Sequence, residues 1–391
     1  MSRPTLEVVD ILREHGKGFI ERNRSWLNWL HIKVLLAIQR CRTAALGGHV
    51  DECVHCEERV TSYNSCRNRH CPKCQASARD RWLAERSKEL LPVPYVHVVF
   101  TLPHELAPLA YQNKRIVYDL LFKASAATLL ELAADPKHLG AEIGFLSVLH
   151  TWGQTLQHHP HVHCVIPAGG PSADHTRWVH ADDKFFLPVK ALRKVFRGKF
   201  HQALKLAFNE DKIRFYGDHE YLNDPKRFRS FLRPLFRKHW IVYCKPPFGG
   251  PQYVLQYLAR YTHRVAISNH RLVRLADGQV TFRWKDYTHG NKQKLMTLDV
   301  DEFLRRFLIH TLPRRFVRIR FFGFLARRKR GRLLPLCRSL LPATPSPAPS
   351  SATTGVELQQ RRCPRCGGLL KIVERLAAVQ TLHPIPVYDT S

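Results

Sequence analysis

The stretch HPHVHCVI, residues 159–166, decides how the middle of this chain folds. Side chains alternate between the two faces of a β-strand, so the valines, cysteine and isoleucine cannot all share a face with the histidines. His161 and His163 lie on one face, together with His159, while Val162 and Cys164 point the other way into a core. Two neutral imidazoles on an open face suit a divalent metal ion that keeps positions for substrate oxygens.

A third ligand must come from a neighbouring segment, and both Gln154 and His150 are candidates. Few carboxylates lie near the pair in the sequence, which argues against an acidic two-metal nuclease site. A pair of histidines can also be no more than the polar face of a sheet, and this alternative stays open at this point.

About ninety residues further along, the stretch GGPQYVLQYLARYTHR (249–264) spaces Tyr253, Tyr257 and Tyr261 four residues apart, as on one face of a helix. Arg260 and Arg264 interleave with them, which favours a helix that faces phosphate. Tyrosine can form covalent catalytic intermediates, but its phenol has a pKa of about 10 and needs help from a metal. A pair of metal-binding histidines and a pair of tyrosines together indicate an enzyme that cuts DNA and holds it covalently. An aromatic stripe packed in a core is the alternative.

The net charge of the chain also favours DNA as the substrate. The 391 residues include 62 Lys and Arg against 32 Asp and Glu, a formal net charge of +30. Such a chain favours a polyanion, with DNA the first candidate, although a merely basic protein remains possible. We expect no membrane span and no signal peptide, and therefore a cytoplasmic, nucleoid-associated bacterial protein. A small-molecule substrate is not expected, and the oligomeric state is not readable.

Eleven cysteines in a chain expected to stay reduced favour metal binding over disulfides. Two CxxC pairs separated by fourteen residues predict one structural zinc site, with the ligands Cys53, Cys56, Cys71 and Cys74. Cys66 and His70 could replace a ligand or form a second site, and buried cysteines without metal are the alternative. Basic residues surround the pairs and predict a DNA-contacting knuckle: Arg67, Arg69 and Lys73.

The pattern of elements predicts an α+β fold, in which a helical zinc-binding domain (1–92) precedes a catalytic domain of strands and helices (93–335). A Pro/Ser-rich linker and a short tail follow (336–391). The tail carries Cys363 and Cys366 but no evident partner pair, so their role stays open. The basic stretch 314–332 alternates like a strand and predicts a phosphate-binding face with Arg318 and Arg320, or else a solvated basic surface.

Six stretches resemble the two-tyrosine HUH transposases of the insertion sequence 91 family. In order, between residues 46 and 290, they are LGGHVDECVHC, YNSCRNRHCPKCQ, VVFTLPHELAP, HTWGQTLQHHPHVHCVIPAGG, YLARYTHRVAISN and FRWKDY. The resemblance implies a zinc-binding domain followed by an HUH nuclease domain, with an antiparallel central sheet and flanking helices. It also implies rolling-circle transposition through single-stranded DNA with Mg²⁺ or Mn²⁺.

Carried over to this sequence, the resemblance makes His161 and His163 ligands of the catalytic metal and Tyr257 and Tyr261 the nucleophiles. It assigns the four cysteines of the two CxxC pairs to Zn²⁺, and it leaves Tyr253 to packing. A plasmid relaxase or rolling-circle replication initiator shares this chemistry and is the alternative. A non-catalytic zinc DNA-binding protein is an alternative of another class, whereas a zinc hydrolase of small substrates fits poorly with the charge.

Overall fold

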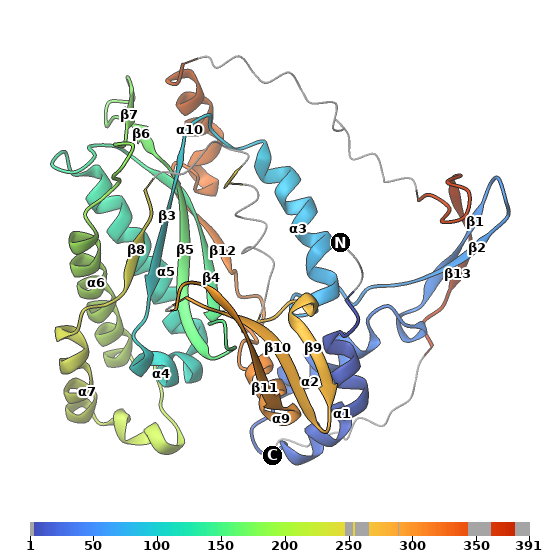
Figure 1. Cartoon of the computed structure of the whole chain (residues 1–391). Helices are drawn as coiled ribbons and strands as arrows, with labels where there is room; N and C mark the ends of the chain where they lie inside the picture. Colours follow the sequence, from blue (N-terminus) through green and yellow to red (C-terminus); the bar gives the residue numbers. More distant parts are fainter. Residues whose placement is uncertain (1–3, 247–252, 255–265, 288, 343–360, 380–391) are drawn as a thin grey trace. The chain divides into compact units, whose positions relative to one another are not determined.

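The computed structural model describes residues 4–246, 253–254, 266–287, 289–342 and 361–379 (Figure 1). The chain divides into two compact units, one formed by residues 1–75 with 345–391 and the other by residues 76–344.

The first unit begins with two packed helices, α1 (Val8–Arg22) and α2 (Trp29–Arg40). A capping box starts α1: the Glu7 side chain accepts a hydrogen bond from the backbone of Asp10, and Asp10 Oδ2 accepts one from the Glu7 N–H at 2.9 Å. The short 3-10 turn η1 (Ala44–Leu46) then leads into β1 (Gly48–Cys53) and β2 (Arg59–Tyr63). The helix α3 (Pro72–Ser87) follows them, and all but its first four residues belong to the second unit.

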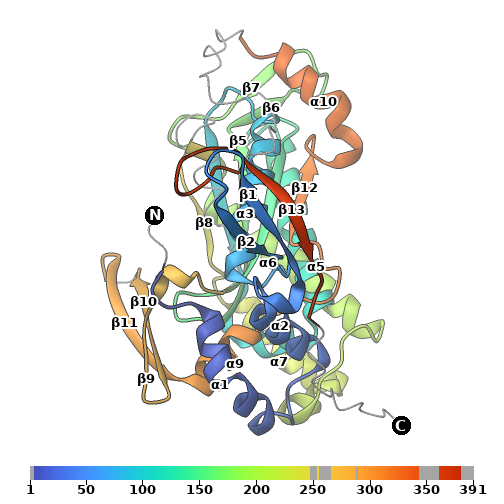
Figure 2. The same ribbon diagram turned by 90° about the vertical axis from the view of Figure 1, so that its right-hand side faces the viewer.

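A strand from the far end of the chain completes the sheet of this unit. β13 (Leu370–Leu376) pairs antiparallel with β1, so the strand order is β13-β1-β2 (Figure 2). The register runs from Gly48 opposite Leu376 to Cys53 opposite Leu370, with one irregularity after Val50. The tail that follows the Pro/Ser-rich segment is therefore part of the amino-terminal unit, although about 300 residues separate the paired strands in the sequence.

The second unit is built on a five-stranded antiparallel sheet with the order β12-β4-β5-β3-β8. Its two central strands, β4 (Gly144–Trp152) and β5 (His158–Pro167), form a hairpin (Figure 1). The flanking strands are β3 (Tyr95–Thr101), β8 (Val242–Cys244) and β12 (Ile319–Gly323). The last residue of β12, Gly323, has φ +59°, and a Cβ there would lie 1.7 Å from the Ile143 carbonyl oxygen, so the position requires glycine.

Helices cover one face of this sheet, where the apolar side chains of β3, β4 and β5 are fully buried. The long helices α5 (Lys114–Ala134) and α6 (Val189–Asn209) run along that face (Figure 1). Phe100 of β3 meets Phe196 of α6 with ring centroids 4.8 Å apart. The shorter helices and turns that join this layer are η2 (His104–Leu106), α4 (Ala107–Gln112), η3 (Gly217–Asn223) and α7 (Pro225–Arg237).

The opposite face of the sheet carries a second buried cluster. Leu146, Val148 and Val165 point to this side and pack in a cluster with Leu333 and Leu334. The last two lie on α10 (Arg327–Ser339), which therefore covers part of the face on which the odd-numbered residues of β5 lie. The small hairpin β6 (Gly169–Pro171) with β7 (Trp178–His180) follows β5 directly.

A three-stranded meander completes the second unit. It consists of β9 (Leu272–Ala276), β10 (Gln279–Asp286) and β11 (Lys292–Asp299), covered by α9 (Val300–Leu308). The short turn η4 (Asn269–Arg271) precedes it. A tight turn at Asp277-Gly278 joins β9 to β10.

This architecture confirms the predicted α+β fold with an antiparallel central sheet and flanking helices. The alternation along β5 is also as predicted, because Val162, Cys164 and Ile166 are fully buried in the helical core. Among the residues that the structure describes, no helix is long and apolar enough to cross a membrane.

Candidate active site and metal centres

Three histidines of the central hairpin come together on the sheet face that lies opposite α5 and α6. His150 of β4 is directly opposite His161 of β5, and Val148 is opposite His163. Paired residues of antiparallel strands share a face, so the three imidazoles project to the same side. One ligand nitrogen from each of the three histidines lies within 4.8 Å of the others. This spacing allows the three nitrogens to bind one metal ion.

The surroundings keep the imidazoles of His161 and His163 in the neutral form that binds metal. Burial, and then the neighbouring His159, lowers the pKa of His161 to about 4. Burial lowers the pKa of His163 well below its usual value, and the nearby histidines add to this shift. At neutral pH both rings are therefore uncharged and offer a lone pair without releasing a proton.

Hydrogen bonds determine which ring nitrogen of His161 and of His163 is available to bind a metal. Nδ1 of His161 lies 2.7 Å from the carbonyl oxygen of His159, which can only accept, so Nδ1 carries the proton and Nε2 is the ligand atom. Nδ1 of His163 lies 2.9 Å from Nε2 of His97, and the two rings stack at an interplanar angle of 4°. A metal ligand at His163 would therefore also use Nε2.

His97 is a site residue that the sequence analysis missed. It is buried in β3 beside β5, and burial, followed by the charges of Lys245 and His161, lowers its pKa to about 3. The Nε2 of a neutral His97 can accept a hydrogen bond from the Nδ1–H of His163 and so set the tautomer of a ligand, as the outer partners of metal-bound histidines do. The one signal for it was a lone histidine in the otherwise β-rich run YVHVVFT (95–101).

The two candidates for the third ligand differ in their surroundings. His150 belongs to the histidine cluster and stacks on Trp152, with ring centroids 4.5 Å apart. The side chain of Gln154 lies in the β4–β5 turn, where its Nε2 donates to Tyr287 Oη at 3.1 Å and its Oε1 accepts from the Lys285 N–H. The structure therefore favours His150.

The neighbouring His158 shows why the strand alternation matters. Its side chain faces the helical side, where Nδ1 lies 3.2 Å from the Ala107 carbonyl oxygen and Nε2 lies 2.7 Å from the Tyr118 hydroxyl. Because the carbonyl only accepts, Nδ1 donates to it and the Tyr118 hydroxyl donates to Nε2. His158 is thus a hydrogen-bonded core histidine, one residue away from a histidine on the site face.

The predicted nucleophiles Tyr257 and Tyr261 lie outside the described residues, as do Arg260 and Arg264. The residues just before them are described. Val254 is fully buried in the same cluster as Val148 and Val165 of the histidine face. Tyr253 is 55% exposed, so the packing residue at this point is Val254 and not Tyr253 as predicted.

The cysteines of the first unit form two clusters of four instead of one. The structure corrects the predicted grouping: Cys71 and Cys74 meet Cys41 and Cys66, while Cys53 and Cys56 meet the two cysteines of the tail, Cys363 and Cys366. In each cluster the four sulfurs lie within 4.8 Å of one another. Four thiolates close a tetrahedral zinc site and leave no position for substrate, so both clusters fit structural zinc.

Sequence spacing could not predict the first of these clusters in full. Cys41 immediately follows α2 and belongs to no CxxC pair, yet its Sγ lies 3.5 Å from that of Cys74. Cys66 Sγ lies 3.6 Å from the same atom, which fits the idea that Cys66 supplies a ligand. His70 is buried but does not belong to the cluster, and its ring Nδ1 lies 3.2 Å from Asn68 Oδ1.

The predicted phosphate contacts have different surroundings. Arg67 and Arg69 are exposed, whereas Lys73 forms an ion pair with Glu7 at the start of α1. Arg320 faces the helical side, where its Nη1 lies 2.6 Å from Asp119 Oδ1 and its guanidinium stacks on Phe122 at 4.3 Å. These partners favour a structural role for Lys73 and Arg320.

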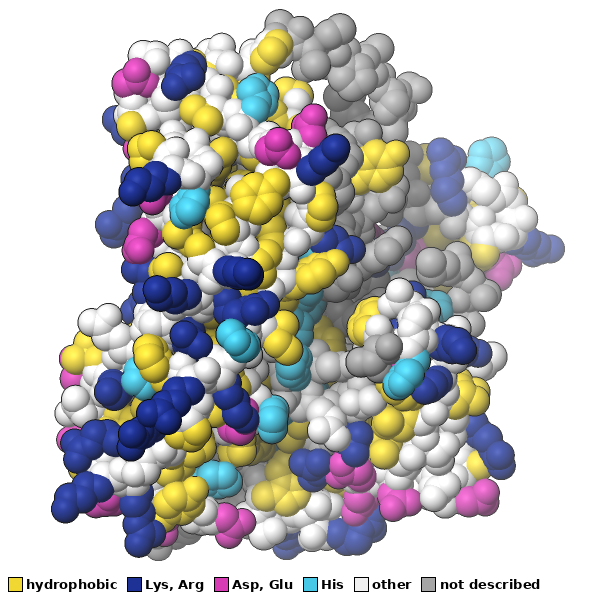
Figure 3. Space-filling model, turned by 60° about the vertical axis from the view of Figure 1, so that its left-hand side comes forward, with side chains coloured by type: hydrophobic (Ala, Val, Ile, Leu, Met, Phe, Trp, Pro, Cys, Tyr) yellow, Lys and Arg dark blue, Asp and Glu magenta, His cyan; other side chains and the backbone are white. Residues whose placement is uncertain are grey.

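A further basic surface was not predicted. The helix α7 buries Phe228, Leu232 and Leu235, and its other side is strongly cationic. Figure 3 shows lysine and arginine side chains gathered over this part of the molecule. The exposed basic residues of α7 and of the residue that follows it are Lys226, Arg227, Arg229, Arg233, Arg237 and Lys238.

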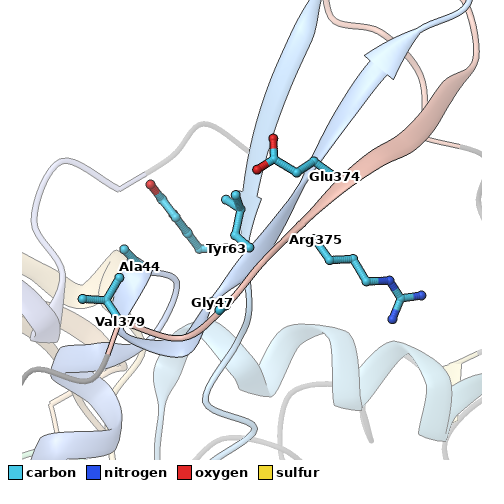
Figure 4. Close-up of a pocket in the computed structure, with 8 residues that line it drawn as sticks. Ala44, Gly47, Tyr63, Glu374, Arg375 and Val379 are labelled. Carbon is cyan, nitrogen blue, oxygen red and sulfur yellow. The ribbon is translucent and has the colours of Figure 1, made fainter.

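A cavity of about 270 Å³ lies in the first unit, beside β2 and β13. It is lined by Ala44, Gly47, Tyr63 and residues of β13 and the segment after it. Figure 4 shows Arg375 directed away from the side on which Tyr63 and Glu374 lie. The cavity therefore lacks a converging set of catalytic groups, and the histidine cluster of the second unit remains the candidate active site.

Comparisons with known proteins give the family of the chain. A sequence model of the "Transposase zinc-binding domain" matches residues 11–102, and one of a family described as "Putative transposase" matches residues 144–332. A relative from Sinorhizobium fredii (strain NBRC 101917 / NGR234), named "Putative transposase y4qJ", is 52% identical over 94% of each chain. The chain belongs to this family of transposases.

A second relative supports the same family at greater distance. The "Transposase for insertion sequence element IS801" from Pseudomonas savastanoi pv. phaseolicola is 28% identical, over 90% of this chain and 87% of that protein. No solved structure matches. The chain is therefore a transposase of an insertion sequence of the 91 family, a DNA-cleaving enzyme with an amino-terminal zinc-binding domain.

Proposed function

We propose that this transposase cuts single-stranded DNA at the ends of its element with a tyrosine nucleophile, assisted by a divalent ion at His150, His161 and His163. The observation that supports this best is the histidine cluster itself. Its three rings lie on one face of an antiparallel sheet, and hydrogen bonds direct the Nε2 atoms of His161 and His163 to the site. Mg²⁺ or Mn²⁺ is the ion that the family resemblance implies, and three imidazoles would leave coordination positions on such an ion for substrate oxygens.

In the proposed reaction, the phenol oxygen of Tyr257 or Tyr261 attacks the phosphorus of the scissile phosphodiester. The phenol gives up its proton to solvent as the bond from phosphorus to the 3′-oxygen breaks, and the 3′-oxygen takes up a proton from solvent to become a free 3′-hydroxyl. The 5′ end stays joined to the enzyme as a phosphotyrosine, which conserves the energy of the bond for later rejoining. The bound ion would polarise the phosphate and offset the charge on the leaving oxygen.

The second tyrosine would accept the other strand in the strand-transfer step of rolling-circle transposition. Support for this arrangement comes from the chain order and from Val254. Val254 is buried in the cluster that contains Val148 and Val165 of the histidine face. Tyr257 follows Val254 by three residues.

The protein also needs to hold DNA strands whatever their sequence. We propose that the basic side of α7 contacts phosphates, since its guanidinium and ammonium groups are exposed and closely spaced (Figure 3). Such contacts position DNA without reading bases. The zinc-binding domain, predicted over residues 1–92, would supply recognition next to the catalytic domain, with Arg67 and Arg69 as exposed basic residues.

The decisive experiment measures covalent adducts on single-stranded oligonucleotides that carry the element ends. Tyr257→Phe and Tyr261→Phe should each reduce adduct formation, and the double variant should abolish it. Tyr253→Phe is the matched control, because this exposed tyrosine lies four residues earlier in the same segment and should retain activity. Mass spectrometry of the adduct peptide would name the attacking residue.

His161→Ala tests the metal. It should remove Mn²⁺-dependent cleavage while leaving binding of the element ends intact, because the zinc-binding domain does not contain it. An undiminished adduct in the double tyrosine variant would overturn the proposal. So would binding without any cleavage by the wild-type protein under all divalent-ion conditions, which would favour a non-catalytic DNA-binding protein.

A further inference from the structure

We propose that Cys53, Cys56, Cys363 and Cys366 bind a second structural zinc ion, which fastens the carboxy-terminal strand to the amino-terminal unit. The transposase zinc-binding match covers residues 11–102 and therefore contains only half of this site. The inference does not depend on the tyrosine chemistry proposed above.

The first argument is that the two CxxC segments have the same backbone geometry. In each, the residue after the second cysteine has a positive φ, +55° at Glu57 and +74° at Gly367. Its N–H donates to the carbonyl oxygen of the first cysteine, at 3.1 Å for Cys53 and 2.9 Å for Cys363. Each first cysteine also donates its own N–H to the carbonyl oxygen two residues past the second cysteine, at 3.0 and 2.8 Å. The turn at residues 363–368 of the tail therefore repeats the turn at residues 53–58, and each of these two CxxC turns is called a knuckle below.

The second argument is that backbone N–H groups point at the sulfurs. The His55 N–H lies 3.4 Å from Cys53 Sγ, and the Gly368 N–H lies 3.4 Å from Cys366 Sγ. Donors of this kind stabilise thiolates, which are the form of cysteine that binds metal. One such contact occurs in each knuckle, so both halves of the site are prepared for negative charge.

The distances between the sulfurs form the third argument. Cys53 Sγ lies 3.4 Å from Cys366 Sγ, and Cys56 Sγ lies 3.6 Å from Cys363 Sγ. Thiolates about 2.3 Å from a tetrahedral zinc ion lie about 3.8 Å apart, whereas disulfide sulfurs lie about 2 Å apart. The observed separations are close to the zinc geometry, and each close pair joins one cysteine of either knuckle.

The remaining contacts hold the two knuckles in register. Gly368 has no room for a side chain, because a Cβ there would lie 3.0 Å from Cys53 Sγ. The Val54 N–H donates to the Leu369 carbonyl oxygen at 3.0 Å, and β13 continues along β1 from that point. Arg361 donates to Asp51 at 2.5 Å, and Asp51 is 1% exposed.

A zinc ion at this site would join residues that lie about 310 positions apart. Closing so long a loop costs conformational entropy, and the pairing of the seven-residue strand β13 with β1 offsets some of this cost. Four metal–sulfur bonds would add further stabilisation, since structural zinc contributes directly to folding. Zinc loading would therefore decide whether the tail belongs to the amino-terminal unit.

The test counts zinc in the full-length purified protein by elemental mass spectrometry and native mass spectrometry. We expect two zinc ions per wild-type chain and one in the Cys363→Ser/Cys366→Ser variant. Cys366→His should keep two, because histidine can replace a thiolate in such sites. Cys244→Ser is the matched control: this cysteine lies in β8, outside both clusters, and its loss should leave two ions.

One zinc ion in the wild-type protein, or two in the Cys363→Ser/Cys366→Ser variant, would overturn the proposal. A second measurement tests the fastening. A recognition site for a specific protease is placed within residues 343–355, and the cleaved protein is passed over a size-exclusion column. The tail fragment should co-elute with the remainder in zinc and separate from it after chelation or in the double serine variant. Equal retention in that variant would show that zinc does not fasten the tail.

Discussion

Replacement of His97 by Phe should weaken the catalytic metal site without removing a ligand. His97 is buried, and its Nε2 lies 2.9 Å from Nδ1 of His163. If His163 binds the metal through Nε2, its Nδ1 carries the proton and needs an acceptor. Phenylalanine fills a similar buried space but cannot accept a hydrogen bond from the Nδ1–H of His163.

The expected magnitude follows from the cost of burying an unpaired donor. Leaving the His163 N–H without an acceptor costs about 1–3 kcal/mol, and each 1.4 kcal/mol changes an equilibrium constant about tenfold. Losses of about 10- to 100-fold in metal affinity are typical when such outer partners are removed. We therefore expect the Mn²⁺ concentration for half-maximal adduct formation to rise by about 10- to 100-fold.

The assay is a Mn²⁺ titration of adduct formation on single-stranded element ends, with calorimetric Mn²⁺ binding as the second readout. His97→Gln should recover most of the affinity, because its amide oxygen can accept the same proton. Val99→Ala is the control for packing, since Val99 lies opposite His163 in β3 and makes no polar contribution. Unchanged Mn²⁺ affinity in a folded His97→Phe protein would refute the role of His97 as a positioning residue.

Two further predictions concern stability. Arg320→Ala should lower the free energy of unfolding by about 1.5–3 kcal/mol in urea titrations, because it removes the ion pair with Asp119 and the cation–π contact with Phe122. Arg328→Ala, at an exposed position, is the control. An equal loss of stability in both variants would contradict the prediction. The hydrogen bond from Arg305, opposed by burial and aided by Arg306, lowers the pKa of Glu302 to about 2. A lowered folded-state pKa stabilises the fold above the unfolded value of about 4.3 and loses that effect as pH falls towards 2. The advantage of wild type over Glu302→Gln, about 1 kcal/mol after allowance for solvent, should therefore shrink between pH 5 and 3, and a constant difference would speak against this ion pair.

Local patterns were enough to predict the strand at the centre of the site. The alternation from His159 to Ile166 places Val162, Cys164 and Ile166 on one face of a strand and therefore assigned His161 and His163 to the other. The same reasoning works for α6, whose buried residues Leu192, Phe196 and Phe200 recur at helical spacing. In both cases neighbours in the sequence carry all the information that the prediction needs.

The partners of these residues depend on pairings between distant strands. His150 belongs to the histidine cluster because β4 pairs with β5 in one particular register. His97 contacts His163 because β3 pairs with the other edge of β5. A shift of one residue in either register would move those histidines to the opposite face. Sequence alone offered His150 and Gln154 as equal candidates for that reason.

The sequence by itself determined the α+β class, the paired histidines on one strand face and the metal-binding character of the cysteine pairs, because each depends on spacing within a few residues. Only the tertiary structure decided how the cysteines divide between two clusters, that Cys41 joins one of them, and that the tail supplies half of the other. The physical reason is that four thiolates form a site through their positions in space. A CxxC spacing specifies one half of such a site, and the path of the chain brings the other half from any distance in the sequence.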